Sequence, residues 1–414
     1  MINTFYDCYN VLSKVYSSGA YLKQALNDTF IEELNRSNIT KICYGVLDKD
    51  IQFEYYISKL CVKRPKTSIR IILKISMYCI KYLSTANYAI VDNAVELVKK
   101  LGKGGTSGFV NAFLRKFISH EIDLPHDEIE RLSVQYSYPV FAVKKLIKDY
   151  GIDRAVSVMS TDTERTCVRF GNSENSEEYL KNLKLSSFET PFKNAYFIEN
   201  FKRSEDYDKG VYTFQSIGSI AICDMVESGE NLLDVCAAPG GKSVYLADKF
   251  KAVTSCDIHE HRVKLIEEYA RRMRKDNISA IQCDSSIFNK DFCGKFESVL
   301  ADVPCSGFGV IKDNPDIKLF RREEDIYSLS KLQYKILQNV SNYVKSGGYL
   351  YYSTCSVFNE ENVDNCKKFL KEHSDFEYVD CESPLKSVKR EVGIQFLPDI
   401  SYGAGFYFCK FRRK

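Results

Sequence analysis

The chain has 414 residues and a mass of 47.5 kDa, which is long enough for two or three domains. Hydrophobic residues make up 44% and charged residues 27%, a balance that excludes a disordered chain and is typical of a globular protein. The formal net charge of +3 permits a nucleic-acid partner without requiring one, because lysine and arginine are spread along the sequence.

The cysteines and the first residues bear on the cellular compartment. The number of cysteines, 15, is odd, and no two of them form a C-x-x-C pair, which argues against a zinc site. The first residues, MINTFYDCYN, carry no signal-peptide pattern. No run of about 18 apolar residues predicts a membrane span. We therefore expect a cytoplasmic protein with reduced thiols and no membrane contact.

Residues 1 to about 120 predict helices throughout. The stretch Ile69–Leu83 is apolar and long enough for a central helix. From Asn93 to Phe117 the pattern is a helix, a glycine-rich loop and a second helix. Five basic residues lie around this loop: Lys99, Lys100, Lys103, Arg115 and Lys116. Charge alone favours an RNA-binding surface and a solvated helical hairpin equally.

The next hundred residues mix helices and strands. A helix is predicted from Tyr138-Pro139 to Tyr150, followed by strands at Thr166–Phe170 and Ala195–Phe201 with a helix between them at Glu177–Leu183. Such a mixture over a short span predicts a small α+β unit. The run Ser204–Lys209 is polar and predicts a loop or linker.

The remainder alternates strands and helices. Strands are predicted at residues 231–235, 252–256, 278–283, 298–301, 348–353 and 405–411, and helices at 242–250, 259–275 and 329–344. This alternation predicts a mostly parallel sheet whose ligands bind at the carboxyl ends of the strands. Four acids stand where a strand should end: Asp234, Asp257, Asp284 and Asp302.

The stretch Asn231–Ser243, NLLDVCAAPGGKS, combines a strand, a turn of small residues and a helix start. This combination is the usual cradle for an anionic or nucleotide-like ligand. It is not a P-loop, because the position five residues before Gly241 is Cys236, and the fingerprint G-x-G-x-x-G is absent. The alternative is a tight turn that binds nothing.

The strand-end acids indicate the kind of ligand. Asp257 is placed to accept hydrogen bonds from a ribose diol, and Asp284, one strand later, to contact an adenine edge. Either acid alone is equally explained as a helix N-cap. Together with a cradle that lacks the phosphate-binding glycines, they suit a nucleoside without a pyrophosphate, such as S-adenosylmethionine.

Two further motifs each place a cysteine just beyond a strand: Asp302–Gly307, DVPCSG, and Ser353–Ser356, STCS. Either cysteine alone is explained as a buried small hydrophobe. The set AAPGGK, DxPCSG and TCS, however, resembles the hallmark motifs of the RNA (cytosine-5)-methyltransferases. The segment Asn93–Phe117 resembles the NusB fold, an all-helical RNA-binding domain. Both halves together resemble the RsmB type of this family.

The resemblance implies an α/β protein with a class I (Rossmann-like) methyltransferase domain, preceded by an all-helical NusB-like domain and a small α+β unit. We place the NusB-like domain at 1–125, the connecting unit at 126–208 and the methyltransferase domain at 209–414. The implied reaction transfers a methyl group from S-adenosylmethionine to carbon 5 of a cytosine in 16S ribosomal RNA, with no metal. The alternatives are the same reaction on transfer RNA and a non-catalytic RNA-binding assembly factor.

The resemblance also implies residue roles. Cys355 is the nucleophile that adds to the base, Asp302 stabilises the ring nitrogen, and Cys305 assists elimination. The S-adenosylmethionine site is implied to comprise Cys236, Ala237, Ala238, Pro239, Gly240, Gly241, Lys242, Asp257, Asp284 and Asp302.

Three positions depart from the family pattern and concern the positioning of the substrate. The family's Arg-x-Asn is Arg169-Phe170-Gly171 here, its Gln-Asp-x-x-Ser is Gln215–Ser219 without the acid, and Lys312-Asp313 replaces a basic step.

Overall fold

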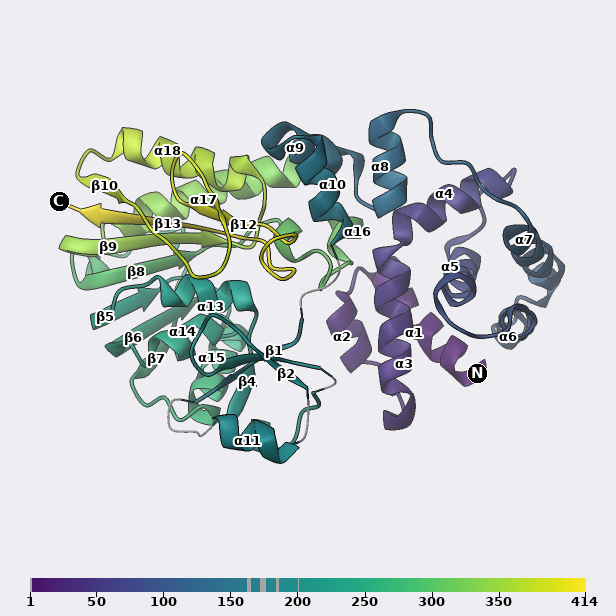
Figure 1. The fold of residues 1–414 in the computed structure, drawn as a ribbon, viewed down its shortest axis with the longest axis horizontal. Coiled ribbons are helices and arrows are strands. Elements are labelled where there is room, and N and C mark those ends of the chain that lie inside the picture. The colour runs from purple at the N-terminus through teal and green to yellow at the C-terminus, as the bar shows by residue number, and fades with distance from the viewer. Residues whose placement is uncertain (1, 162–164, 172–175, 184–185, 200) are drawn as a thin grey trace. The chain divides into compact units, whose positions relative to one another are not determined.

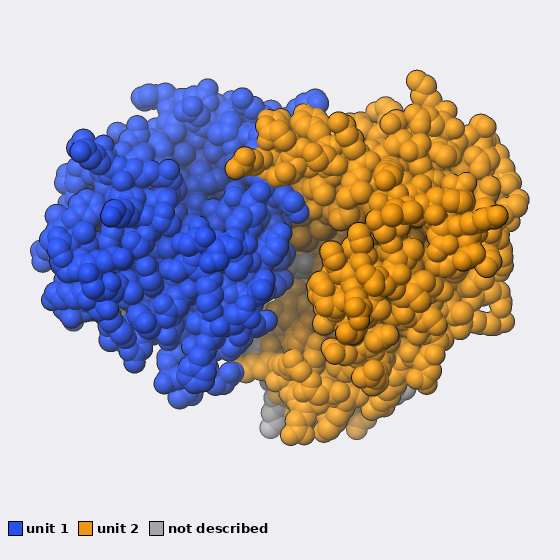
Figure 2. Space-filling view, turned by 180° about the vertical axis from the view of Figure 1, so that it is seen from behind, with its two compact units in different colours: residues 1–160, 311–321 blue, residues 161–310, 322–414 orange. Residues whose placement is uncertain are grey.

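The apolar residues at helical spacing near the amino terminus fold as helices in the computed structural model, which describes residues 2–161, 165–171, 176–183, 186–199 and 201–414. The chain divides into two units (Figure 2). Unit 1 comprises Met1–Ser160 and Ile311–Arg321, and unit 2 comprises Thr161–Val310 and Arg322–Lys414. No helix among the described residues is both long and apolar enough to cross a membrane.

Unit 1 is helical, which confirms the prediction for the first 120 residues (Figure 1). Its helices are α1 (Ile2–Ser18), α2 (Leu22–Asn27), α3 (Glu33–Asp48), α4 (Asp50–Leu60), α5 (Thr67–Tyr82), α6 (Asn87–Lys100), α7 (Ser107–Ser119), α8 (Glu128–Tyr136), α9 (Val140–Tyr150), α10 (Ile152–Ser160) and α16 (Ile317–Phe320), with a 3₁₀ turn, η1 (Gly104–Thr106), before α7.

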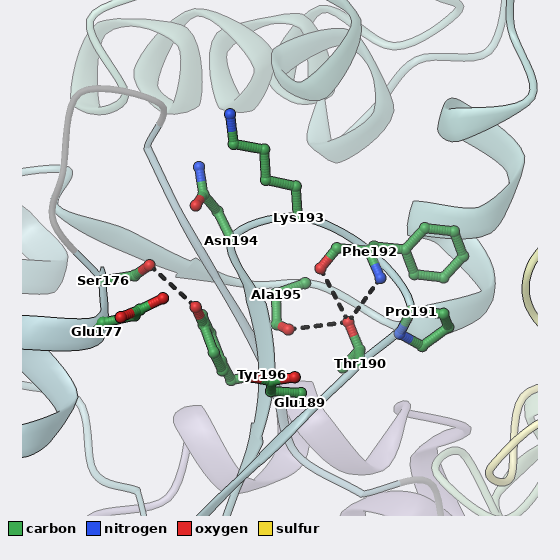
Figure 3. A pocket seen from close by; sticks show the side chains of 10 residues that line it. All are labelled: Ser176, Glu177, Glu189, Thr190, Pro191, Phe192, Lys193, Asn194, Ala195 and Tyr196. Carbon is green, nitrogen blue, oxygen red and sulfur yellow. Dashed lines mark hydrogen bonds between the residues drawn. The ribbon is translucent and has the colours of Figure 1, made fainter.

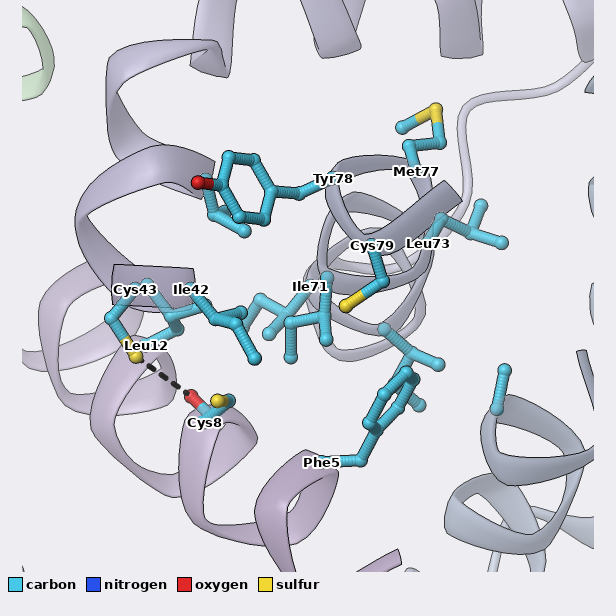
Figure 4. Packing of buried hydrophobic residues seen from close by; sticks show 14 of the residues in the cluster. Phe5, Cys8, Leu12, Ile42, Cys43, Ile71, Leu73, Met77, Tyr78 and Cys79 are labelled. Atoms are coloured by element: carbon cyan, nitrogen blue, oxygen red, sulfur yellow. Dashed lines mark hydrogen bonds between the residues drawn. The ribbon is translucent and has the colours of Figure 1, made fainter. Parts of the chain in front are cut away.

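Helix α5 is central to unit 1, as its apolar run predicts. Cysteines of three helices, Cys8, Cys43 and Cys79, are buried in the core around it and pack beside Phe5 and Tyr78 (Figure 4). These cysteines therefore act as small hydrophobes.

The segment Ile311–Arg321 is held inside unit 1 by buried polar contacts. Asp316 Oδ2 accepts a hydrogen bond from the backbone N–H of Leu22 at 2.9 Å. The side chain of Lys318 is fully buried and donates to Asp48, to the backbone oxygen at 2.8 Å and to Oδ1 at 2.9 Å. The ammonium lies 5.2 Å from the ring centroid of Tyr138. A buried lysine with these partners fixes the segment against the helices.

Unit 2 contains a sheet of nine strands. Five are parallel and lie in the order β9 (Val344–Thr354), β8 (Phe296–Asp302), β5 (Gly229–Asp234), β6 (Phe250–Asp257) and β7 (Ile278–Gln282). The antiparallel strand β13 (Phe406–Arg413) lies next to β9 and also pairs with β12 (Ile394–Phe396) and β10 (Phe376–Val379), while β11 (Val388–Lys389) pairs with β12. The mostly parallel sheet predicted from the sequence is confirmed.

Helices cover both faces of this sheet. Successive residues of a strand point to opposite faces, so neighbouring strand residues pack against different helices. Leu232 packs in the cluster of α13 (Ile217–Asp224) and α14 (Gly241–Leu246), whereas Leu233 packs in the cluster of α17 (Glu323–Ser341) and α18 (Val363–Glu372) (Figure 1). Helix α15 (Glu260–Arg272) connects β6 to β7.

A second, four-stranded antiparallel sheet also belongs to unit 2. Its order is β2 (Ser187–Glu189), β3 (Ala195–Ile198), β1 (Cys167–Phe170) and β4 (Tyr212–Phe214), with α11 (Ser176–Leu183) beside it in the chain. The small α+β unit is confirmed as a fold. The prediction of a loop at Ser204–Lys209 is wrong in part, because it contains the one-turn helix α12 (Glu205–Asp208). The three-domain boundaries stay a prediction.

Candidate functional site

The turn between β5 and α14 has the geometry that its small residues allow. Gly240 has a φ of +105°, in the left-handed region that favours glycine. A Cβ atom at Gly240 would also lie 3.3 Å from the Cα of Ile266. The next residue, Gly241, begins α14, and its carbonyl accepts a hydrogen bond from Gln215 Nε2 at 3.2 Å. Glycine at position 240 is therefore required by the backbone.

Asp234, the last residue of β5, is hydrogen-bonded to the helix that follows this turn. It is fully buried, and its Oδ2 accepts a hydrogen bond from the Ser243 hydroxyl at 2.7 Å. The Ser255 hydroxyl donates in turn to Ser243 at 2.9 Å. Burial raises the pKa of Asp234 to about 7, which the Ser243 hydrogen bond only partly opposes.

A pocket of about 420 Å³ opens at the carboxyl ends of the parallel strands. Seven of the predicted site residues line it: Cys236, Ala238, Asp257, Asp284, Asp302, Cys305 and Cys355. They follow five different strands, so the sheet brings together residues that are more than 100 positions apart. Apolar side chains of Ile258, Leu332 and Ile336 complete the wall.

The other predicted cofactor residues lie in the turn but do not line the pocket: Ala237, Pro239, Gly240, Gly241 and Lys242. Lys242 instead forms an ion pair with Asp302, with 2.6 Å between Nζ and Oδ2. Burial disfavours the charged lysine, but the Asp302 carboxylate outweighs it and the pKa of Lys242 is raised. The Ser353 hydroxyl donates to the second Asp302 oxygen at 2.6 Å.

The two remaining acids each accept a hydrogen bond from the backbone N–H two residues later, and neither is a helix N-cap, because the N-cap of α15 is His259 and no helix begins at Asp284. Asp257 accepts from the backbone of His259 at 3.1 Å, and Asp284 accepts from that of Ser286 at 2.9 Å. Asp257 also lies 3.4 Å from Nη1 of Arg262, whose Nη2 donates to the carbonyl of Ala238. Arg262 was not predicted, because only folding brings α15 against the turn.

The two motif cysteines meet in the pocket wall. Cys355 directly follows β9, Cys305 lies three residues beyond β8, and their sulfur atoms are 3.0 Å apart. The backbone N–H of Cys355 also points to the Cys305 sulfur, at 3.2 Å. The hydrogen bond to Cys355, followed by burial, raises the pKa of Cys305 well above its usual range. Cys305 therefore favours its protonated form and is held against Cys355 by both contacts.

Sequence reasoning missed the polar groups behind the cysteines. Glu361 is buried and accepts hydrogen bonds from Ser306 and Ser356, and Gln333 donates to it from α17. Glu361 stands in the polar run FNEEN, where nothing in the sequence distinguishes it from the less buried Glu360. No group of three or more His, Cys, Asp or Glu residues suited to a metal ion occurs in the described part of the chain.

Two of the positions that depart from the family pattern are joined by a hydrogen bond. Arg169 of β1 is 5% exposed, and its Nε donates to Gln215 Oε1 at 2.7 Å. Since Gln215 also donates to the Gly241 carbonyl, the small sheet is bonded to the cradle turn.

A separate hollow of about 430 Å³ lies at the small sheet and contains none of the predicted site residues (Figure 3). Its wall includes Glu177, Lys193 and Tyr196, and Thr190 donates within it to the carbonyl of Ala195 at 2.8 Å. Its lining contains no cysteine and so offers no thiol nucleophile.

The charges of the strand-end pocket fit S-adenosylmethionine better than a phosphorylated nucleotide. Three carboxylates, Asp257, Asp284 and Asp302, line it. The one guanidinium in the wall, that of Arg262, is engaged with Asp257 and a carbonyl. Such a wall repels a phosphate but suits a ribose diol and the positive sulfonium and ammonium groups of S-adenosylmethionine.

Comparison with known proteins assigns the family. The family model described as "16S rRNA methyltransferase RsmB/F" matches residues 222–412, and the NusB family model matches residues 5–119. The chain is 31% identical to the "probable ribosomal RNA small subunit methyltransferase B" of Bacillus subtilis (strain 168), over 96% of this chain and 95% of that protein. It is 27% identical to "ribosomal RNA small subunit methyltransferase B" of Escherichia coli O127:H6, over 93% and 92% of the two chains.

The crystal structure of PH0851 resembles the whole chain, with a TM-score of 0.84 at 22% identity and coverage of 100% of this chain and 98% of that one, and so shows the same fold. The resemblance drawn from the three motifs and the NusB-like helices is thereby confirmed. With a relative above 30% identity along almost its full length, the chain belongs to the RsmB/F family of 16S rRNA methyltransferases, which are S-adenosylmethionine-dependent enzymes.

Proposed function

We propose that this protein methylates carbon 5 of a cytosine in 16S ribosomal RNA through a covalent adduct between Cys355 and carbon 6 of the base. The pair of sulfur atoms 3.0 Å apart, beside Asp302 in the wall of the pocket, carries the proposal. The names of the relatives support ribosomal RNA of the small subunit as the substrate.

Carbon 5 of cytosine is too electron-poor to attack a methyl group directly. The Cys355 thiolate forms a bond to carbon 6, which makes carbon 5 nucleophilic. The cofactor supplies an activated methyl group to carbon 5. Asp302 is held by Lys242 and Ser353. It shares a proton with the ring nitrogen: the proton moves onto the nitrogen and neutralises the negative charge that develops there during addition, and it returns to Asp302 when the ring is restored.

Cys305 acts in the second half of the reaction. In the free protein its sulfur is held 3.0 Å from that of Cys355. Bonding of Cys355 to carbon 6 breaks this hydrogen bond and leaves Cys305 beside carbon 5. Cys305 then gives its proton to water and, as a thiolate, takes the proton from carbon 5. The bond between carbon 6 and Cys355 breaks and the aromatic ring is restored.

Cofactor binding follows from the same pocket. We assign the ribose diol to Asp257 and the adenine edge to Asp284, with Cys236 and Ala238 of the turn in the wall of the same pocket. The basic residues around the loop between α6 and α7 supply phosphate contacts for the RNA.

The test uses 16S ribosomal RNA from cells that lack this protein, incubated with the purified chain and methyl-labelled S-adenosylmethionine. Mass spectrometry of the nucleosides should show 5-methylcytidine. Cys355→Ala should abolish methylation and leave no RNA attached, because no adduct forms. Cys305→Ala should accumulate RNA joined to the protein, seen as a shifted band on a denaturing gel, because elimination is slowed.

Three outcomes would contradict the proposal. A band with Cys355→Ala instead of Cys305→Ala would reverse the two roles. Unchanged activity in both variants would make the cysteines packing residues. Label in transfer RNA but not in ribosomal RNA would refute the substrate.

A further inference from the structure

The buried carboxylate of Glu361, behind the two cysteines, accepts four hydrogen bonds. It lies in the 3₁₀ turn η4 (Asn359–Glu361) between β9 and α18, and its side chain is fully buried. An ionised carboxylate has about four acceptor sites. Glu361 Oε1 accepts from the Ser306 backbone N–H at 2.8 Å and from Gln333 Nε2 at 2.9 Å. Its Oε2 accepts from the hydroxyls of Ser306, at 2.6 Å, and Ser356.

The two serines that bond to Glu361 are the residues directly after the motif cysteines. Ser306 follows Cys305, and Ser356 follows Cys355. One carboxylate therefore joins two turns that are 50 residues apart in the sequence. The hydroxyl oxygens of the two serines are themselves 3.3 Å apart.

The residues before the cysteines are held by neighbours of Glu361. Gln333 donates to the carbonyl of Pro304 at 2.9 Å as well as to Glu361. Asn362 accepts from the Thr354 hydroxyl at 2.6 Å and donates to the Ser356 carbonyl at 3.0 Å. Each cysteine is thus flanked on both sides by groups of one buried network.

We propose that Glu361 is a positioning residue for the methyl transfer, because it clamps Ser306 and Ser356 and thereby fixes the separation of the two sulfur atoms. The inference rests on the proposed function, in which one sulfur bonds to carbon 6 and the other acts at carbon 5 of the same base. These two carbons are bonded to each other, so the sulfurs must keep a fixed separation. A displacement of about 1 Å can cost about 100-fold in rate.

The charge of Glu361 acts in the same direction as its geometry. The pKa of Cys305 is raised first by the hydrogen bond to Cys355, then by burial, and also by the negative charges of Cys355 and Glu361. A negative Glu361 therefore favours the protonated form of Cys305.

The variant Glu361→Gln keeps the shape of the side chain but puts an amide N–H group where donors now converge. We expect kcat for methyl transfer to fall about 10-fold to 100-fold. The KM for S-adenosylmethionine should stay unchanged, because the hydrogen bonds described for Glu361 involve neither Asp257 nor Asp284. A purely structural role would instead change stability without this split between kcat and KM.

A second measurement is independent of catalysis. Oxidised glutathione exchanges with two protein thiols to give a protein disulfide and two molecules of reduced glutathione. The equilibrium constant gives the effective concentration of the Cys305–Cys355 pair. We expect it to fall about tenfold in Glu361→Gln, since the two turns are no longer joined by one acceptor.

The matched control is Val340→Ala, which removes buried volume from α17 seven residues after Gln333 and leaves every donor to Glu361 in place. It should lower stability but preserve kcat and the effective concentration of the thiols. If Glu361→Gln does not fold, Ser306→Ala and Ser356→Ala, which each remove one hydroxyl donor, should lower both quantities by smaller factors.

Different outcomes test the role of Glu361 and the proposed reaction. An effective thiol concentration that is equal in wild type and Glu361→Gln, or in wild type and both serine variants, overturns the inference. A wild-type protein that forms no 5-methylcytidine overturns the proposed function instead, while the thiol measurement still tests the clamp.

Discussion

At the scale of single residues, the buried carboxyl group of Asp234 lies beside the cradle turn, and ionising it lowers the stability of the fold. Asp234 is fully buried, with one oxygen bonded to Ser243 and the other without a hydrogen-bond partner among the described residues. Burial raises its pKa from 3.8 to about 7. Between these two values the folded chain holds a proton that the unfolded chain has lost.

This difference predicts the pH dependence of stability. Because the folded state binds more protons between pH 3.8 and about 7, the free energy of unfolding should fall as the pH rises through this window. The full gap corresponds to about 4 kcal/mol at pH 8. Asp234→Asn imitates the protonated form, so its stability should be nearly independent of this titration and should exceed that of the wild type at pH 8.

Urea unfolding at pH 5, 6, 7 and 8 measures the effect. Asp276→Asn, a change at an exposed acid, is the control and should keep the wild-type slope. A slope that persists unchanged in Asp234→Asn would assign the pH dependence to other groups.

At the scale of elements, a tightly packed turn contacts both cysteine motifs. The 3₁₀ turn η3 (Phe308–Val310) follows Cys305, and its Gly309 donates a backbone hydrogen bond to the Cys355 carbonyl at 2.9 Å. A Cβ atom at Gly309 would lie 1.9 Å from the carbonyl oxygen of Gly405 and 2.8 Å from that of Cys355. Both neighbours are backbone atoms, so neither can turn away.

Gly309→Ala should therefore displace the nucleophile. We expect it to cost about 1–3 kcal/mol of stability and to lower kcat more than 10-fold, measured by urea unfolding and by methyl transfer at saturating substrates. The control is Gly229→Ala at the start of β5, where the nearest atom, at 2.8 Å, is the end of the flexible Glu297 side chain. Equal activity of the two variants would show that η3 adapts without moving Cys355.

The parallel strands were predictable because each contains an apolar run, which ends at or near an acid in β5 to β8 and at Thr354-Cys355 in β9, and the structure confirms all five. Helix α17 begins at Glu323 rather than at the predicted Leu329, since its first turn is polar and gives no apolar periodicity. The site's strand-end residues were predictable from the same pattern. Glu361 and Arg262 were not, because their partners lie on other elements and only packing brings them together.

At the scale of the whole molecule, the net charge is small, but the basic residues around the loop between α6 and α7 differ in how far they are engaged with other side chains. Lys99 is paired with Glu96, and the Lys100 ammonium lies 4.0 Å from the ring centroid of Tyr6. Arg115 and Lys116, on α7, are exposed. We expect these two to be the more available for phosphate contacts.

Arg115→Ala/Lys116→Ala should raise the KM for ribosomal RNA several-fold and leave kcat unchanged. The slope of log affinity against log salt should become shallower by about 0.7–0.9 for each phosphate that the variant no longer neutralises. The matched variant Lys23→Ala/Lys41→Ala removes the same charge from exposed positions on α2 and α3. If it weakens binding equally, the effect belongs to the net charge and not to the loop region.

The docked segment Ile311–Arg321 has a consequence for the order in which the chain folds during synthesis. Helices α1 to α10 leave the ribosome before the partners of Asp48 and Leu22 exist. At about 5–20 residues per second, synthesis of Thr161–Val310 takes on the order of ten seconds. During this time the helices of unit 1 lack Lys318, and the residues that bury its side chain lack their partner. Lys318 becomes available only after the motif DVPCSG, which carries Cys305, has been synthesised. Unit 1 is therefore completed only after residues 161–310 of unit 2 have been synthesised.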